Sequence, residues 1–211
     1  MPSTPNLFEY DSAVNLLSQD GEVYYYGSIF DSLTSNLYLE TLLATIPWKH
    51  DEAVICGKHI ITARKVAWVG DTSFFYTYSG VSKRATPWTP LLLELKSKVE
   101  ILTKTVFNSC LLNLYHDGSE GMAWHSDDEQ SLGKKTTIAS ISFGAERKFA
   151  FKHKLTKQTK SIVLEHGSLL IMQGDTQTFW QHSLLKTLRV QEPRVNLTFR
   201  TIVNGLNEVN K

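Results

Sequence analysis

The chain has 211 residues, of which 42% are hydrophobic and 20% are charged, the balance of a folded globular protein. This length suits one large domain or two small ones. Apolar runs are short, such as residues 168–172, so we expect no membrane span, and residues 1–5 do not resemble a secretory signal. Two cysteines, Cys56 and Cys110, exclude a disulfide framework and a Cys-x-x-Cys zinc site, and they fit a reducing cytoplasm.

The net charge of +1 hides an uneven distribution along the chain. Residues 1–60 contain eight acidic and two basic side chains, whereas residues 133–160 contain eight basic side chains and one acidic. A basic stretch beside a binding site can follow a phosphate backbone. A solvated lysine-rich loop has the same composition, and the sequence leaves both interpretations open.

The chain begins with a polar, irregular segment that we interpret as an N-terminal extension, residues 1–22. Residues 23–26 are β-prone, and Asp31 is expected to cap a helix over about residues 32–46. The expected packing face of this helix consists of Leu33, Leu37, Leu39, Leu42, Leu43 and Ile46.

Residues 53–80 predict two or three strands joined by turns. Three aromatic side chains in or near these strands lie close in sequence to Arg64 and Lys65: they are Trp68, Tyr76 and Tyr78. Such a group can stack on bases and contact phosphates. Aromatic side chains in the core of a small sheet give the same pattern, so both readings stay open.

A second helix is expected over about residues 90–105, where Leu91, Leu92, Leu95, Val99 and Leu102 recur at helical spacing. After residue 106, short β-prone runs separated by glycines predict strands at 109–115, 136–143, 148–152, 160–165, 168–172, 178–181 and 195–202. Many short strands without intervening helices favour a sandwich or jelly roll. We therefore expect a mainly β protein with flanking helices (α+β), organised as a single domain over residues 23–211 with a β core at about 106–203.

A His-x-Asp pair, His125 and Asp127, follows a glycine-rich loop. If the pair lies on a strand, both side chains share one face. An imidazole and a carboxylate side by side make two-thirds of a 2-His-1-carboxylate site for a metal such as Fe(II), which leaves positions open for other ligands. His182, in a strand-like run, is the preferred third ligand, and His166 is the substitute.

The stretch 194–200 alternates polar and apolar residues. As a strand it places Arg194, Asn196, Thr198 and Arg200 on one face. Two buried guanidiniums require anionic partners, and a dicarboxylate co-substrate would pair with them bidentately. A structural ion-pair network within the protein is the alternative.

Six motifs in chain order resemble the AlkB family of Fe(II)- and 2-oxoglutarate-dependent dioxygenases. They are Asn113-x-Tyr115, His125-x-Asp127-Asp128-Glu129, Ser140-Ile141-Ser142-Phe143-Gly144, His166-Gly167-Ser168-Leu169, His182 and Arg194-x-Asn196-Leu197-Thr198-Phe199-Arg200. The likeness covers about residues 23–203 and is closest to the DNA-repair members. It implies a double-stranded β-helix (jelly-roll) core with an N-terminal α/β nucleotide-recognition lid at about residues 53–85.

The resemblance also implies roles for individual residues. His125, Asp127 and His182 would bind iron. Arg200 would pair with the distal carboxylate of 2-oxoglutarate, with support from Asn113, Tyr115 and Thr198. Arg194 and Asn196 would lie near the carboxylate that chelates the metal.

On the substrate side, Asp128 matches an acidic residue at the target base, where it would meet the exocyclic amine. Tyr76 and Ser79 match the substrate lid, and Arg64 matches a basic residue of the same region. Cys56 stands where some double-strand-preferring members carry a bulky aromatic wedge, so the resemblance implies no preference for duplex.

The implied function is oxidative dealkylation of bases such as 1-methyladenine and 3-methylcytosine in DNA, with release of formaldehyde, succinate and carbon dioxide. The implied cofactors are Fe(II), 2-oxoglutarate and dioxygen. Alkylated DNA, single- or double-stranded, is the expected partner, and the protein is expected to be a monomer. We expect it in the cytoplasm, associated with the nucleoid if the source is bacterial, and in the nucleus if the source is eukaryotic. Three alternatives stay open. The substrate could be RNA, the protein could be a 2-oxoglutarate oxygenase that acts on a protein side chain or small molecule, or it could be a non-enzymatic β-barrel binding module.

Overall fold

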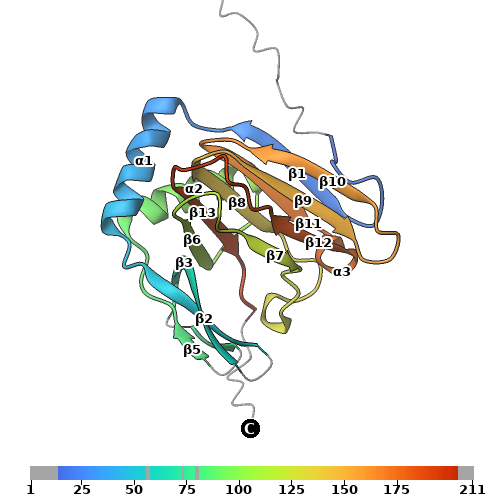
Figure 1. The fold of residues 1–211 in the computed structure, drawn as a ribbon, viewed down its shortest axis with the longest axis horizontal. Coiled ribbons are helices and arrows are strands. Elements are labelled where there is room, and N and C mark those ends of the chain that lie inside the picture. Colours follow the sequence, from blue (N-terminus) through green and yellow to red (C-terminus); the bar gives the residue numbers. More distant parts are fainter. Residues whose placement is uncertain (1–13, 56–57, 73, 79–80, 204–211) are drawn as a thin grey trace, which may run out of the picture.

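Two antiparallel sheets face each other and form the body of the protein (Figure 1). The computed structural model describes residues 14–55, 58–72, 74–78 and 81–203. The larger sheet has the order β1 (Glu22–Ser28), β11 (Ser168–Gln173), β8 (Ile138–Gly144), β13 (Arg194–Arg200), β6 (Ser109–Tyr115), β3 (Lys58–Gly70) and β2 (Lys49–Ile55). The smaller sheet has the order β10 (Thr159–Leu164), β9 (Arg147–His153), β12 (Trp180–Leu184) and β7 (Met122–His125). The predicted mainly β class, with flanking helices, is confirmed.

The remaining elements lie outside these two sheets. They are the hairpin of β4 (Phe75–Tyr78) and β5 (Val81–Arg84), the helices α1 (Ser32–Thr45), α2 (Pro90–Thr103) and α3 (Thr176–Phe179), and the 3-10 turn η1 (Gln130–Leu132). None of the helices in the described ranges is long and apolar enough to cross a membrane. The larger sheet includes β1, β2 and β3 in addition to strands from the predicted 106–203 core.

Helix α1 begins at the predicted cap but packs through a different face. The Asp31 carboxylate accepts hydrogen bonds from the backbone N–H and the hydroxyl of Thr34, each at 2.8 Å. Leu42 is fully buried, but Leu33 and Leu37 are 83% and 61% exposed, so the prediction that these two belong to the packing face is wrong. The buried face consists of Ser35, Tyr38 and Leu42, because the contacts with the sheet, and not leucine spacing alone, decide which side of the helix turns inward.

Two hydrophobic clusters fill the spaces on either side of the larger sheet. One contains Val195, Leu197 and Phe199 of β13 together with the buried side chains of α1 and α2. The other, with Val23, Phe151 and Trp180 among its members, lies between the two sheets. The apolar face of β13 is therefore turned toward the helices, and its polar face is turned toward the smaller sheet.

Local structure departs from the sequence-based expectation in two places that matter for the site. Strand β7 ends at His125, so Asp127 lies in the following loop and not on the same strand. The predicted strand at 178–181 is partly helical, because α3 occupies Thr176–Phe179 before β12 begins at Trp180.

Candidate metal centre

Three side chains that suit a divalent metal converge between the sheets. His125 ends β7 and pairs in register with His182 on the neighbouring strand β12, and their ring centroids lie 4.2 Å apart. Asp127 reaches both rings from the loop after β7: its Oδ1 is 3.9 Å from His125 Nε2, and its Oδ2 is 3.8 Å from His182 Nε2. One potential ligand atom from each residue lies within 4.8 Å of the others. The two histidines and the carboxylate that the sequence singled out are thus brought together.

The group is buried on one side and open on the other. The side chains of Asp127 and His182 are 6% and 4% exposed, whereas that of His125 is 29% exposed. The Nδ1 atom of His125 lies 2.8 Å from the backbone carbonyl of Ala123, which requires the proton on Nδ1 and leaves the Nε2 lone pair directed at the group. Such a tautomer is what a metal-ligating histidine needs.

Burial and charge set the protonation of the two buried members. Burial alone would raise the pKa of Asp127, but Arg200, His182 and His125 together hold it below its usual value. The guanidinium of Arg200 donates to Asp127 Oδ1 through Nη2 at 2.8 Å. Burial lowers the pKa of His182 to about 3. At neutral pH the site therefore holds a carboxylate anion and a neutral imidazole, which are the protonation states that bind a metal ion.

A row of polar side chains extends from this group along the inner face of β13. The Thr198 hydroxyl donates to Asn196 Oδ1 at 3.1 Å, and Asn196 Nδ2 donates to the Ser140 hydroxyl at 2.7 Å. At the far end, Arg194 Nη2 donates to the Ser142 hydroxyl at 2.9 Å. The alternation predicted for this strand is confirmed, because the intervening Val195, Leu197 and Phe199 all lie in the hydrophobic cluster on the other side of the sheet.

Arg194 is a buried cation that forms no ion pair with a carboxylate of the described residues. It is 2% exposed and lies with its guanidinium carbon 5.6 Å from the centre of the Tyr115 ring. Its Nε has no hydrogen-bond partner among the described residues, and burial lowers its pKa to about 10. A buried guanidinium without a carboxylate partner among the described residues is able to bind an anion.

The two arginines occupy opposite ends of the polar row. Arg200 contacts the candidate ligand Asp127, while Arg194 lies six residues earlier in β13. The expected division of roles, in which Arg200 would bind the distal carboxylate of 2-oxoglutarate, stays a prediction, and the contact of Arg200 with Asp127 favours the opposite division. Alternation fixed the shared face of the two residues but gave no information on which end of the strand meets the metal ligands.

Other expected residues have different surroundings. Asn113 accepts a hydrogen bond from Arg64 Nη1 at 2.9 Å, and Arg64 also pairs with Asp51, so this arginine is fixed within the protein. Asp128 is exposed and its carboxylate lies 3.6 Å from Lys154 Nζ. Trp68 donates to the Ser109 hydroxyl and stacks on Phe74, as a partly buried sheet aromatic does.

Most of the expected lid residues lie partly or wholly outside the described part of the structure. Tyr76 belongs to β4, but its side chain lies outside the described part of the structure, as does that of Tyr78. Ser79 and Cys56 lie outside the described residues altogether.

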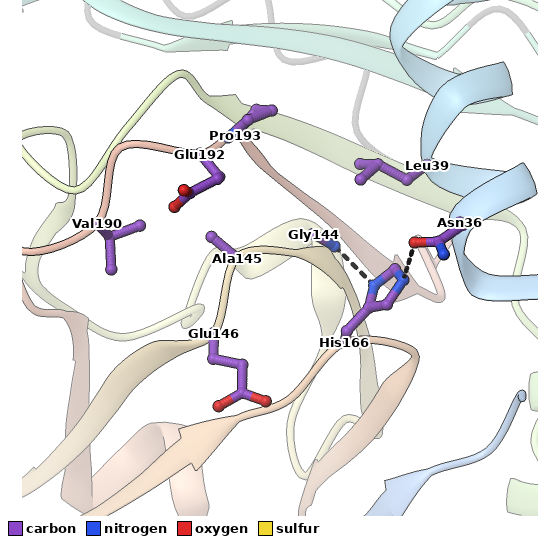
Figure 2. Close-up of a pocket in the computed structure, with 9 residues that line it drawn as sticks. All are labelled: Asn36, Leu39, Gly144, Ala145, Glu146, His166, Val190, Glu192 and Pro193. Atoms are coloured by element: carbon purple, nitrogen blue, oxygen red, sulfur yellow. Dashed lines mark hydrogen bonds between the residues drawn. The ribbon is translucent and has the colours of Figure 1, made fainter. Parts of the chain in front are cut away.

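His166, the substitute ligand, lies in a different part of the molecule. Its Nδ1 accepts from the backbone N–H of Gly144 at 2.8 Å, and its Nε2 lies 3.1 Å from Asn36 Oδ1 (Figure 2). It lines a cavity of about 670 Å³ between α1 and the loop before β13, with Glu146 and Glu192 among its neighbours. His166 is not a member of the metal-compatible group found within the described residues.

Three further residues lie near the group and were not predicted from the sequence to be functional. Gln177 of α3 accepts the backbone N–H of Asp127, and the Ser126 hydroxyl donates to the carbonyl of Trp180. Glu129 lies 3.9 Å from Arg200, and burial raises its pKa. Only the position of Glu129, two residues after Asp127 in an acidic run, was visible as a signal in the sequence.

A profile of the 2OG-Fe(II) oxygenase superfamily matches residues 22–200, which is most of the chain. The chain therefore belongs to this superfamily, whose members use Fe(II), 2-oxoglutarate and dioxygen.

Two individual proteins indicate which members of the superfamily the chain is similar to. The chain is 40% identical over 190 residues to the alpha-ketoglutarate-dependent dioxygenase alkB homolog 3 of Mus musculus, a match that covers 85% of this chain and 66% of that protein. It is 41% identical over 157 residues to the DNA oxidative demethylase ALKBH2 of Bos taurus, covering 71% of this chain and 56% of that protein. The resemblance to the AlkB family is thus confirmed, and the chain spans somewhat less than two thirds of these relatives.

Solved structures share the fold at low sequence identity. A 2OG-Fe(II) oxygenase family oxidoreductase from Burkholderia pseudomallei superposes with a TM-score of 0.56 at 14% identity, covering 89% of this chain and 88% of that one. A structure described as OsALKBH1 gives a TM-score of 0.53 at 15% identity, covering 80% and 90% of the two chains.

The residues present fit the cofactors of the superfamily. Two imidazoles and one carboxylate, open on the side of His125, make a donor set suited to Fe(II) with positions left for other ligands. The unpartnered Nε of Arg194 at the end of the same polar row suits a carboxylate of 2-oxoglutarate.

Proposed function

We propose that this protein removes N-alkyl groups from DNA bases by oxidation and restores the unmodified base. The observation that carries the proposal is the group of His125, Asp127 and His182, with Arg200 bound to Asp127 and the buried Arg194 on the same face of β13. The names of the two curated relatives support a demethylase of DNA as the particular activity. 1-Methyladenine and 3-methylcytosine are the proposed lesions.

The chain's own part is to hold the metal and its co-substrate. His125, Asp127 and His182 would bind Fe(II) through Nε2, a carboxylate oxygen and Nε2. Iron with 2-oxoglutarate and dioxygen supplies the oxidising power that releases the alkyl carbon as formaldehyde, with succinate and carbon dioxide as co-products. Arg200 keeps Asp127 ionised by direct contact, so the ligand stays an anion.

The positions of the two arginines support a proposal for the two ends of 2-oxoglutarate. Arg194, with Tyr115 beside it, would take the distal carboxylate, because it is buried and lies far along β13 from Asp127. Arg200 would lie beside the end that chelates the metal. Asn196 and Thr198 line the path between the two ends, and Asn113 lies opposite Asn196 in the β6–β13 register.

The substrate side rests on fewer contacts. Asp128 is exposed next to the metal ligand Asp127, where its carboxylate would meet the exocyclic amine of a flipped base. Tyr76 and Ser79 would form the lid over that base, within a lid region at about residues 53–85. Arg64 would act indirectly, by fixing Asn113 through the hydrogen bond between them.

The proposed partner is alkylated DNA, and the compartment is the one that holds DNA. The proposed organisation is a monomer with an extension at residues 1–22 and one catalytic domain at residues 23–211.

The test is aerobic incubation of the protein with Fe(II), ascorbate, 2-oxoglutarate and oligonucleotides that contain 3-methylcytosine. DNA and RNA are compared, each as single and double strands, and succinate and the repaired base are followed by mass spectrometry. Asp127→Ala is the matched variant, because it removes one ligand while leaving the polar row of β13. We expect repair of DNA by wild type and none by Asp127→Ala.

Each other outcome has a definite meaning. Repair confined to RNA would replace the proposed substrate. Succinate without base repair would retain the oxygenase and point to a protein side chain or a small molecule as substrate. No succinate from iron-loaded wild type would overturn the oxygenase and favour a binding module.

A further inference from the structure

Asp127 lies in a loop and is not part of a β-strand. Strand β7 ends at His125, so the backbone N–H of Asp127 lies beyond the β7–β12 ladder. This N–H is buried, and a buried amide without a partner costs free energy. Its partner is the side-chain oxygen Oε1 of Gln177, at 2.9 Å.

Both polar atoms of the Gln177 side chain have a partner. It is 7% exposed, and its Nε2 lies 3.6 Å from the sulfur of Met172, which directs Oε1 toward Asp127. Lys154 holds the surrounding helix α3, because its Nζ donates to the carbonyl of Gln177 at 2.9 Å and its backbone N–H donates to that of Phe179 at 2.7 Å. The acceptor for Asp127 therefore has little freedom to move.

A second contact ties the same loop to the same segment. The Ser126 hydroxyl donates to the carbonyl of Trp180 at 2.9 Å, two residues before the ligand His182. The loop between the ligands His125 and Asp127 is thus joined to the segment that leads into the third ligand. The Gln177 contact holds the backbone of Asp127 itself, so it sets the direction in which the Asp127 side chain leaves the loop, and the Ser126 contact ties the neighbouring side chain to the backbone of Trp180.

Direction matters here because Asp127 has a competing partner. Arg200 lies 2.8 Å from Oδ1 and draws the carboxylate toward the larger sheet, whereas His182 lies 3.8 Å from Oδ2. A loop free to follow Arg200 would move the carboxylate away from the two imidazoles. An anchor at the backbone of Asp127 keeps it within reach of both.

We propose that Gln177 is a positioning residue of the metal centre, which holds Asp127 in the ligating geometry by binding its backbone N–H. The proposal rests on the metal site named above and adds a residue that touches neither metal nor substrate. Its role is to preorganise the metal ligand, as the hydrogen-bonding partners of metal ligands do in general.

The test is a titration of metal-free protein with Co(II), whose visible absorption reports both affinity and coordination. Gln177→Met keeps the length of the side chain and removes the acceptor. We expect about tenfold weaker binding and a changed Co(II) spectrum, the usual scale for loss of such a partner. Gln173→Met is the matched control. Gln173 lies four residues before Gln177, and its side chain makes an exposed hydrogen bond to Glu22. This control variant should bind Co(II) as wild type does.

Ser126→Ala provides a milder variant should Gln177→Met fail to fold. It removes one hydrogen bond from the same loop, and we expect about fivefold weaker Co(II) binding. Thermal unfolding of each metal-free variant separates loss of fold from loss of affinity. Wild-type affinity and spectrum in folded Gln177→Met would overturn the positioning role while leaving the metal site intact. Failure of wild type to bind Co(II) would overturn the metal site itself.

Discussion

At the scale of single residues, Arg194 and Arg200 show that two identical side chains on one strand face can have different tasks. Arg200 is neutralised by Asp127 at 2.8 Å. Arg194 is buried beside Tyr115, with its Nε unpartnered among the residues that the structure describes. The cation that the protein leaves unneutralised is the one expected to recognise an anionic co-substrate.

Replacement of Arg194 by Met should therefore raise the KM for 2-oxoglutarate while leaving metal affinity unchanged. A hydrogen-bonded charge pair contributes about 1.5–3 kcal/mol, which corresponds to an increase of about 10- to 150-fold. The measurement is succinate production against 2-oxoglutarate concentration, together with a Co(II) titration. Arg189→Met, an exposed arginine in the preceding loop, serves as the control. An unchanged KM in Arg194→Met would remove Arg194 from the co-substrate site.

At the scale of elements, helix α1 shows that an apolar side chain on a helix need not be buried. Leu33 and Leu37 are apolar and exposed, whereas Leu42 on the same helix is fully buried in the cluster under the larger sheet. Leu42→Ala should lower the free energy of unfolding by about 3 kcal/mol, because it leaves a cavity. Leu33→Ala should change it by less than about 0.5 kcal/mol. Urea unfolding of the two variants makes the comparison, and equal losses would contradict the observed face of the helix.

Arg147 joins two elements of the smaller sheet in a way that no local pattern indicates. Its buried guanidinium donates to the backbone carbonyls of Asp117, Gly118, Glu120 and Leu185, at 2.6 to 3.2 Å. It thereby ties the loop before β7 to the end of β12. Both of these strands carry a candidate metal ligand.

Arg147→Met should lower the free energy of unfolding by about 3 kcal/mol or more, because several buried carbonyls lose their donor at once. Lys148→Met removes a neighbouring charge that is exposed and should have little effect. Urea unfolding of the two variants decides, and a loss in Arg147→Met no larger than in Lys148→Met would show that water replaces the guanidinium.

These elements also show what the sequence could predict. Alternation over residues 194–200 is a local property, so the polar face of β13 was predictable, as were the capped start of α1 and the spacing of the three candidate ligands. The turn of helix at α3 was not, because its residues are β-prone and its position depends on contacts such as that between Gln177 and Asp127. Which arginine lies beside the candidate metal ligands was not predictable either, because the direction of the strand relative to the smaller sheet is a tertiary property.

At the scale of the whole molecule, the site depends on the contact between the two sheets. The imidazoles come from the smaller sheet, while Arg200 and Arg194 come from the larger one. Charge is concentrated where they meet, in the buried pair of Asp127 and Arg200 next to the neutral His182. The stability of the metal-free fold is therefore linked to the protonation of this interface.

The free energy of unfolding of the metal-free protein should fall as the pH drops below about 6.5. Burial lowers the pKa of His182 from 6.5 to about 3. Between these values the unfolded chain holds a proton on this imidazole and the folded chain does not, so unfolding takes up a proton and acid favours the unfolded state. Asp127 acts in the same direction at lower pH, because its pKa is also held below its usual value.

Urea unfolding in the presence of a chelator at pH 7.5, 6.0 and 5.0 measures the effect, which should approach about 1.4 kcal/mol per pH unit for one fully linked proton. His182→Gln should flatten the dependence, because the variant has no imidazole to protonate on unfolding. A slope in His182→Gln equal to that of wild type would locate the linked proton elsewhere. The interface between the sheets would then not be the acid-sensitive part of the fold.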